Sequence, residues 1–408
     1  MERRKIPQLL SFELSKEEIY NNAKENKLLR LGVKVNTPLA CNWACPYCYA
    51  GSSENSDRPK IKENLYYKGI DPYKDKNWLE KMQNWIRQGI EMGVNTVTIN
   101  GTFEPATAPD ILNIIKFCRE NNIYTTLVTN GTLWSYEQLE ELYNLGICIL
   151  TKLNVPMVDE KNENYKLFCD IQKELSGRKQ DSKTVYEEQK KLINDLIKIG
   201  FNKHVGNNCT RLGVESIIAK NNLKYLPDLV KQLRELNIYS HVEVMKLQGF
   251  ARNNPNLQVT KSEIKQLFQN ILDNDIASNF EPWEVKPPYA AGSCYQNLVR
   301  VDLKADGNIA PCPGIDLILG NMNENKLEDI LKNEKLKIIR NLEQYIQGDC
   351  KNCELFKNKE CYGGCRGTVY QTLANNGCSE YECLVGSDPS CHRVKNVLDN
   401  GLTSDIFK

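Results

Sequence analysis

The sequence predicts an α/β protein in which six parallel strands alternate with helices, followed by a small cysteine-rich domain. Short apolar runs alternate with amphipathic stretches between residues 29 and 290. After that point the pattern changes to short loops rich in Gly and Cys. The length of 408 residues also exceeds what one hydrophobic core usually supports, so a large domain and a smaller one are expected.

Each expected strand is a short apolar run, and each expected helix has apolar residues at helical spacing. The predicted strands are 29–35, 96–100, 127–129, 147–153, 213–219 and 239–245. The predicted helices are 78–92, 110–120, 136–145, 226–236 and, inside a polar insertion at about 156–210, 185–199. Such alternation implies a parallel sheet, open or curled into a partial barrel, that binds ligands at the carboxyl ends of its strands.

Three regions follow from this pattern. Residues 1–28 form an N-terminal extension, residues 29–290 form the domain with the parallel sheet, and residues 291–408 form the small domain. One helical stretch, 326–345, is expected in the last region. Loops so poor in apolar residues need cross-links, so the small domain is expected to be held together by metal.

Composition excludes several classes of protein. Lys and Arg total 53 against 52 for Asp and Glu, and a net charge of +1 argues against a nucleic-acid-binding surface as the main function. No apolar run approaches the length of a membrane span. Sixteen cysteines without a signal peptide predict a cytoplasmic protein with metal sites rather than a disulfide framework.

The loop after the first predicted strand carries Cys41, Cys45 and Cys48. Three thiolates in so short a loop can hold three irons of a [4Fe–4S] cluster and leave the fourth iron open to a ligand. The alternative is a zinc knuckle, but zinc sites normally close with a fourth Cys or His nearby, and none occurs in the next 60 residues. The spacing therefore indicates an open iron–sulfur site.

The cysteines cluster again at the other end of the chain, where nine fall in the last 115 residues. They are Cys294, Cys312, Cys350, Cys353, Cys361, Cys365, Cys378, Cys383 and Cys391. Clustering of this kind in an intracellular protein indicates metal binding. The three histidines are too few and too scattered to suggest a zinc enzyme.

The Cys-x3-Cys-x2-Cys spacing, with the aromatic Tyr47 just before the last Cys, resembles the signature of the radical S-adenosylmethionine (SAM) superfamily. The resemblance implies a partial (β/α)6 TIM-like barrel and a [4Fe–4S] cluster whose open iron binds SAM. It also implies reductive cleavage of SAM to a 5′-deoxyadenosyl radical, which abstracts hydrogen from the substrate. An electron donor such as a flavodoxin or ferredoxin is the implied partner.

Four further segments resemble parts of that family's SAM site. Residues 100–105 stand where the family has a Gly-Gly-Glu-Pro motif, with Thr102 and Phe103 in place of the glycines. By resemblance, the backbone at Gly101 and Thr102 and the carboxylate of Glu104 accept hydrogen bonds from the SAM ammonium. Three more segments complete the resemblance: Asn130 after the third strand, Asn154 after the fourth as a ribose ligand, and the 249–252 loop near the adenine.

The C-terminal cysteines resemble a SPASM domain, which carries two auxiliary [4Fe–4S] clusters; a pair of zinc ribbons is the alternative. The resemblance assigns three cysteines to auxiliary cluster I, namely Cys294, Cys312 and Cys365. It assigns four to auxiliary cluster II, namely Cys350, Cys353, Cys361 and a distal Cys that is Cys391 or its rival Cys383. Cluster I then has either an open iron or a fourth ligand from Cys378 or Cys383.

Substrate identity is weakly encoded. SPASM enzymes mostly oxidise or cross-link peptide or protein side chains, which is the expected function here; a small-molecule dehydrogenase or rearrangement enzyme is the alternative. A non-enzymatic electron carrier is a remote alternative, because an electron carrier has no need of the SAM-binding segment that contains Glu104. Only 40 residues precede Cys41, so a leader-binding domain is expected to be absent or supplied by a partner. The catalytic base is sought in the 280–292 loop, at Glu281, Glu284 or Tyr289.

Overall fold

A nine-stranded sheet runs through the chain in a computed structural model that describes residues 2–35, 41–49, 75–101, 103–206 and 208–406. The strand order is β11-β10-β9-β2-β3-β4-β5-β7-β8, and all neighbours from β9 to β8 are parallel. The strands of the parallel part are β2 (Arg30–Val35), β3 (Thr96–Gly101), β4 (Tyr124–Val128), β5 (Cys148–Lys152), β7 (Leu212–Ile218), β8 (Tyr239–Val244) and β9 (Arg300–Leu303).

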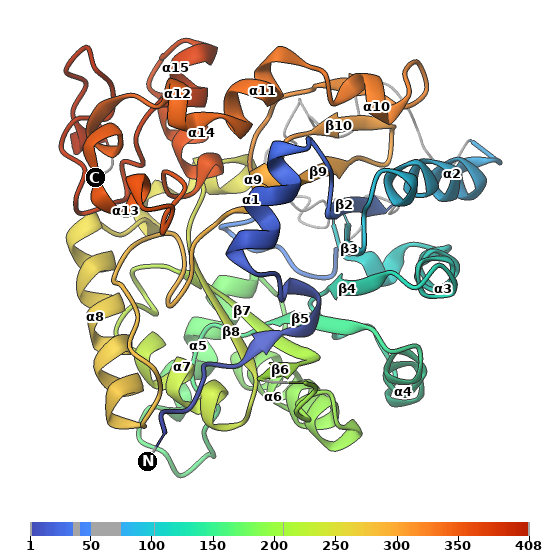
Figure 1. Cartoon of the computed structure of the whole chain (residues 1–408). Helices are drawn as coiled ribbons and strands as arrows, with labels where there is room; N and C mark the ends of the chain where they lie inside the picture. The colour runs from blue at the N-terminus through green and yellow to red at the C-terminus, as the bar shows by residue number, and fades with distance from the viewer. Residues whose placement is uncertain (1, 36–40, 50–74, 102, 207, 407–408) are drawn as a thin grey trace.

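The six predicted strands are therefore present as β2, β3, β4, β5, β7 and β8, and the α/β fold class is confirmed. Helices follow the strands, and most of them cover the outer side of the curved sheet (Figure 1). They are α2 (Trp78–Glu91), α3 (Ile111–Glu120), α4 (Tyr136–Asn144), α5 (Tyr165–Ser176), α6 (Ser182–Ile199), α7 (Leu226–Glu235) and α8 (Lys261–Ala277). The two edges of the sheet, β8 and β11, do not pair, so the barrel stays open.

Helix α2 shows why these segments are helical. Its buried residues Trp78, Met82, Trp85, Ile86 and Gly89 recur every three or four positions, which places them on one face against the sheet. The other helices follow the same rule, and several begin with a side-chain cap.

The C-terminal region joins the same sheet instead of standing apart from it. Strand β9 lies beside β2 with Arg300 opposite Arg30, and β10 (Asn308–Ala310) and β11 (Gly320–Asn321) extend it antiparallel. The hydrophobic core is correspondingly continuous from the helices of the barrel to the C-terminal helices. The sequence patterns did not predict β9, because its four residues include a buried Arg and a buried Asp.

The prediction of a single helix over 326–345 is wrong. Three short helices take its place, α10 (Leu327–Ile330), α11 (Glu334–Arg340) and α12 (Leu342–Tyr345). Asn333 begins α11 by accepting a hydrogen bond from the Lys335 amide, and Asn341 separates α11 from α12 with backbone angles (φ −121°, ψ 40°) that are not helical. Asparagine competes for backbone hydrogen bonds and so favours helix ends over helix interiors. The region also contains α9 (Gln296–Val299), α13 (Glu354–Lys357), α14 (Arg366–Asn375) and α15 (Glu380–Val385).

The predicted insertion at 156–210 packs on the barrel. Helices α5 and α6 lie against one another, and the buried Gln189 of α6 donates to the carbonyl oxygens of Asn130 and Lys152. The insertion thereby reaches the carboxyl ends of β4 and β5.

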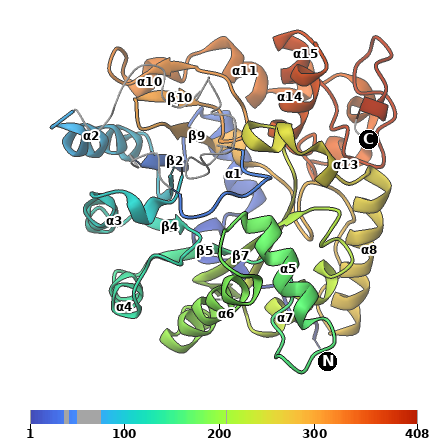
Figure 2. The ribbon, with the colours of Figure 1, turned by 180° about the vertical axis from the view of Figure 1, so that it is seen from behind.

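The N-terminal extension crosses the opposite end of the barrel (Figures 1 and 2). Strand β1 (Gln8–Leu9) pairs with β6 (Cys209–Thr210), the hydroxyl groups of Ser11 and Thr126 are hydrogen bonded, and α1 (Lys16–Lys24) packs beside α9. Among the described helices, none has the length and apolar character that crossing a bilayer requires.

Candidate functional site

The cysteine loop, described from Cys41 to Tyr49, is held in place by backbone hydrogen bonds to two other segments of the chain. The Ala44 amide donates to the Ser176 carbonyl at the end of α5 (2.9 Å), and the Phe250 amide donates to the Cys48 carbonyl (2.9 Å). Gly177 and Gly249 have positive φ and approach the loop so closely that a Cβ would lie 2.1 Å from the carbonyl oxygens of Ala44 and Tyr49 respectively. The predicted 249–252 loop therefore positions the cysteine loop.

Replacing Gly249 by Ala tests this role of the 249–252 loop. Both the left-handed backbone and the contact with Tyr49 oppose a side chain, so we expect an unfolding free energy lower by about 1–3 kcal/mol and reduced iron retention after anaerobic reconstitution. Thermal unfolding and iron content measure the two effects. Gly377→Ala is the matched control, because Gly377 also has positive φ but no atom lies within 4 Å of its virtual Cβ. Equal losses in the two variants would contradict this role.

The thiols of Cys41, Cys45 and Cys48 line one cavity, here called the loop cavity, with about 900 Å³ of empty space that is partly open to solvent. Burial, followed by the neighbouring Cys48, raises the pKa of Cys45 to about 12, and burial raises that of Cys41 as well. Thiols in this setting stay protonated unless a metal binds them as thiolates. The amide of Trp43 donates to the Cys41 sulfur (3.4 Å), as amides do to sulfurs of iron–sulfur clusters. The donor set fits a [4Fe–4S] cluster.

Glu104 lines the loop cavity at the end of β3, where the sequence predicted the SAM edge. Its carboxylate accepts hydrogen bonds from the Thr129 hydroxyl and from the amides of Asn130 (2.8 Å) and Ala106 (3.1 Å). Burial raises the pKa of Glu104 above its ordinary value, although the three hydrogen bonds act to lower it. Gly101 ends β3 beside it, and Thr102 lies outside the described residues.

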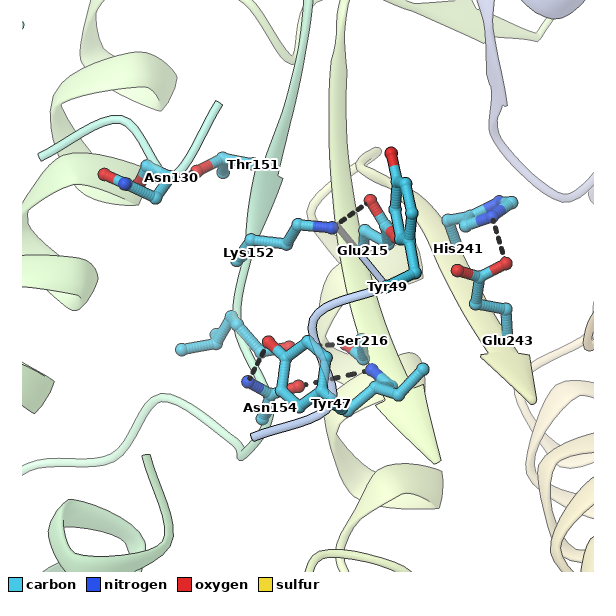
Figure 3. A network of polar contacts seen from close by, with 12 residues as sticks. Tyr47, Tyr49, Asn130, Thr151, Lys152, Asn154, Glu215, Ser216, His241 and Glu243 are labelled. Carbon is cyan, nitrogen blue, oxygen red and sulfur yellow. Dashed lines mark hydrogen bonds and ion pairs between the residues drawn. The ribbon is translucent and has the colours of Figure 1, made fainter. Parts of the chain in front are cut away.

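Asn130 and Asn154 take different positions (Figure 3). Asn130 lines the loop cavity and donates to the Asn42 side chain (2.8 Å), which ties it to the cysteine loop. Asn154 is fully buried and does not line that cavity; its amide nitrogen lies 3.4 Å from the hydroxyl of Tyr47, which does. The structure thus places Asn154 behind Tyr47, and its role as a ribose ligand stays a prediction.

A second cavity, here called the inner cavity, adjoins the loop cavity inside the barrel and has about 850 Å³ of empty space, again partly open. The two share lining residues on the inward faces of the strands. Cys294, Cys312 and Cys365 also line the inner cavity, so the structure brings together the three cysteines predicted for auxiliary cluster I. The Thr368 amide donates to the Cys365 sulfur (3.4 Å).

Charged side chains from three neighbouring strands line both cavities, and Figure 3 shows Lys152, Glu215 and Glu243 among them. Lys152 and Glu215 form an ion pair across β5 and β7. On β8 and the residues that follow it, Glu243 accepts a hydrogen bond from Lys246 (2.7 Å) and lies 3.7 Å from His241 Nε2. These residues were not among the predicted site residues, although a Glu inside an apolar strand, as in 212–218 and 239–244, indicates an inward-facing charge.

A third cavity, in the C-terminal region, is lined by Cys350, Cys353, Cys361 and Cys391. These are the four cysteines predicted for auxiliary cluster II with Cys391 as the distal ligand. The rival Cys383 is buried on α15, where its sulfur lies 3.8 Å from the Cys378 carbonyl oxygen, and it lines none of the three cavities.

The buried Asp388 connects the last two cavities. It lines the third cavity, and its carboxylate accepts a hydrogen bond from the amide of Cys365 (2.9 Å), whose thiol lines the inner cavity. Gly364, at positive φ, lets the Asp388 carboxylate approach, since a Cβ there would lie 2.0 Å from it. In the described part of the chain, no three Cys, His, Asp or Glu side chains are grouped tightly enough for a single metal ion, so the cavities and their donor sets carry the assignment.

The 280–292 loop supplies one of its three predicted catalytic candidates to the site. Tyr289 lines the inner cavity and contacts the His241 ring (centroids 4.5 Å apart). Glu281 and Glu284 are exposed, and Glu284 pairs with Arg393 at the surface. They point away because the apolar residues of this loop, Phe280 and Trp283, take the positions against the barrel.

Comparison with known proteins agrees with this site. The model of the radical SAM superfamily matches residues 35–216, and that of the SPASM iron–sulfur cluster-binding domain matches residues 294–354. The first match spans the triad Cys41, Cys45 and Cys48, and the second spans the first four C-terminal cysteines, Cys294, Cys312, Cys350 and Cys353.

Two curated relatives and two solved structures illustrate the similarity. PqqA peptide cyclase of Gluconobacter oxydans is 19% identical over 78% of this chain and 84% of the relative. The tungsten-containing aldehyde ferredoxin oxidoreductase cofactor-modifying protein of Pyrococcus furiosus is 22% identical over 77% and 85%. Streptococcus suis SuiB bound to S-adenosylmethionine has a TM-score of 0.59 at 19% identity, over 91% of this chain and 80% of that one. The anSMEcpe structure with bound AdoMet and the Cp18Cys peptide has a TM-score of 0.56 at 15% identity, over 84% and 90%.

The two structures share the fold of this chain, and the family matches identify the cofactors. The radical SAM domain binds SAM and a [4Fe–4S] cluster, and the SPASM domain binds auxiliary iron–sulfur clusters. In the structure, the cysteine triad and the cysteines Cys294, Cys312 and Cys365 line two adjoining cavities of one sheet. The chain therefore contains a radical SAM domain and a SPASM domain, and it is an enzyme.

Proposed function

We propose that this enzyme oxidises a peptide or protein side chain, by removing hydrogen from it and leaving a new double bond or cross-link. The observation that carries the proposal is the adjacency of the loop cavity and the inner cavity. A substrate that fills both lies between the site of hydrogen removal and a site that can accept an electron.

The residues divide into groups with separate tasks. Cys41, Cys45 and Cys48 hold the cluster that binds SAM; Cys294, Cys312 and Cys365 hold auxiliary cluster I; Cys350, Cys353, Cys361 and Cys391 hold auxiliary cluster II. When bound, SAM and its cluster supply a radical that removes a hydrogen atom, and the auxiliary clusters supply acceptors for the electron that the substrate then loses. The Glu104 edge and Asn130 orient SAM, and Tyr47 closes the cavity wall.

Glu243 takes the role of base that was predicted for the 280–292 loop. It lines both cavities, so a substrate bound there can reach its carboxylate. Burial alone would raise its pKa, but Lys246 and His241 hold the pKa well below its ordinary value, which keeps the group ionised. An ionised carboxylate in this position accepts the proton that a substrate radical releases on oxidation.

Replacing Glu243 by Gln should lower product formation about 100-fold or more, because general-base catalysis contributes that much. Cleavage of SAM should at the same time become uncoupled, with more 5′-deoxyadenosine formed per product. Both are measured by mass spectrometry of one reaction. Glu281→Gln is the control, since Glu281 is exposed at the surface. Coupled turnover by Glu243→Gln at the wild-type rate would remove Glu243 from the mechanism.

The proposal that the substrate is a peptide is supported by relatives whose names describe peptide modification, PqqA peptide cyclase among them. The test is anaerobic incubation of the reconstituted enzyme with SAM, a reductant and short peptides encoded near its gene. A peptide that loses two hydrogens per 5′-deoxyadenosine supports the proposal. Cleavage of SAM without change in any peptide or protein tested would contradict it.

A small molecule is the second candidate substrate. The adjoining cavities are lined by paired charges on β5, β7 and β8, which suit a polar molecule of limited size. Two relatives, the cofactor-modifying protein of Pyrococcus furiosus and the AdoMet-dependent heme synthase of Methanosarcina barkeri (19% identical over 84% of this chain), carry names that point to cofactors. The same assay with extracted metabolites in place of peptides distinguishes the two.

A further inference from the structure

A further cavity, here called the seam cavity, lies where the barrel fails to close. It is lined by the first residues of β2 and β8, by the N-terminal extension and by the loop before Cys294, and it has about 940 Å³ of empty space that is partly open. Phe12, His241, Tyr289 and Gln296 line both this cavity and the inner cavity. The seam cavity therefore adjoins the space between the cysteine sets from the opposite side.

Arg30 lines the seam cavity and is 6% exposed. Its Nη2 donates to the Phe12 carbonyl (2.7 Å), its guanidinium lies 5.4 Å from the centre of the Phe12 ring, and its Nε is buried without a hydrogen-bond partner. No carboxylate among the described residues forms an ion pair with it. Burial and the adjacent Arg300 lower the pKa of Arg30 to about 10, which still leaves the group charged at neutral pH.

Two other buried arginines are in ion pairs, Arg234 with Asp275 and Arg300 with Asp302. Arg340 and Arg366 are, like Arg30, buried outside any ion pair of the described residues, but they line none of the cavities described above. Buried charges are normally paired because desolvation without a partner is strongly unfavourable. A buried, unpaired guanidinium on the wall of a cavity is the feature expected of a site for an anion, and a planar carboxylate matches its donors.

The other walls fit a carboxylate on an organic group better than an inorganic anion. Phe12, Tyr239, Tyr289 and Tyr295 contribute aromatic rings, and the Tyr239 hydroxyl lies 2.9 Å from His241 Nδ1. Such walls accept the apolar part of a ligand while Arg30 holds its charged end.

We propose that Arg30 binds a carboxylate of the substrate in the seam cavity, while the carbon to be oxidised extends into the inner cavity. That the bound carboxylate belongs to the substrate rests on the proposed function. In a peptide the carboxylate belongs to an acidic side chain or to the C-terminus, and in a small molecule it belongs to an organic acid.

The test measures binding to the reconstituted enzyme by saturation-transfer NMR with three probes. N-acetyl-L-glutamate α-amide carries only a side-chain carboxylate, N-acetyl-L-alanine carries only an α-carboxylate, and N-acetyl-L-glutamine amide carries none. At least one acidic probe should bind about tenfold or more tightly than the neutral one, as charge-assisted hydrogen bonds predict. Which acidic probe binds identifies the source of the carboxylate.

Variants connect that preference to Arg30. Arg30→Gln should abolish it, and Arg30→Lys should keep part of it. Arg211→Gln is the matched control, because Arg211 also stacks on an aromatic ring and donates to a carbonyl, yet lines none of these cavities. It should retain the full preference.

Three outcomes overturn the proposal. They are equal binding of acidic and neutral probes by wild type, an unchanged preference in Arg30→Gln, and an Arg30→Gln variant whose only change is in iron content or cluster spectra. The last would mean that Arg30 balances the charge of the nearby Cys294 cluster. The proposed function fails separately, if wild type with bound clusters forms no 5′-deoxyadenosine whatever the probes do.

Discussion

A Cys45→Ala variant should lose cleavage of SAM altogether, with 5′-deoxyadenosine formation at least about 1,000-fold below wild type. Two thiols cannot retain a cluster that three hold with one iron open, so iron should fall from about twelve to about eight atoms per chain. Anaerobic reconstitution, iron analysis and chromatography of the nucleoside measure both effects.

The control for this variant is Cys118→Ala, which removes a thiol that is fully buried on α3 and packed in the core. It should keep its iron and its activity. Full iron content in Cys45→Ala would contradict the assignment of the triad, and lost iron without lost cleavage would contradict its role in binding SAM.

The second large effect concerns the distal ligand of auxiliary cluster II. A cluster with four cysteines can survive the loss of one, as the open cluster shows, but not of two. Cys353→Ala combined with Cys391→Ala should therefore lose about four irons and one signal in the electron paramagnetic resonance spectrum of the reduced protein. The matched double variant, Cys353→Ala with Cys383→Ala, should retain both.

This pair of variants separates the two sequence-based alternatives directly. Cys391 lines the cavity with its three partners, whereas Cys383 lies against the Cys378 carbonyl. The reverse pattern of iron loss would assign the cluster to Cys383. Equal retention in both variants would mean that the third cavity holds no cluster.

Much of the barrel could be predicted from the sequence because its strands are buried on both faces and therefore read as apolar runs. The strands at 212–218 and 239–244 satisfied this rule despite carrying Glu215 and Glu243. The same charges identify the inner cavity, but only the fold shows that they meet. Their pairing with Lys152 and Lys246 joins residues on different strands or beyond a strand end.

The parts that were missed depend on long-range pairing. Strand β9 is short and partly charged, and it becomes a strand because β2 offers it a partner some 270 positions earlier in the chain. The 280–292 loop was predicted to supply a carboxylate to the site, yet Glu281 and Glu284 face solvent. Which side chain of an irregular loop turns inward is decided by packing and has no periodic pattern in the sequence.

The pairing of β9 with β2 has a consequence for electron transfer. Cys294 and Cys312 flank β9 and β10, while the triad follows β2, so hydrogen bonds between β2 and β9 set the spacing of the two cysteine sets. A slip of one residue would displace one set by about 3.3 Å and turn every β9 side chain to the other face. Under the proposed function, the distance an electron must cross is thus set by strand register rather than by a linker. Cutting the chain before residue 291 would also leave the fully buried β2 as an unpaired, aggregation-prone edge.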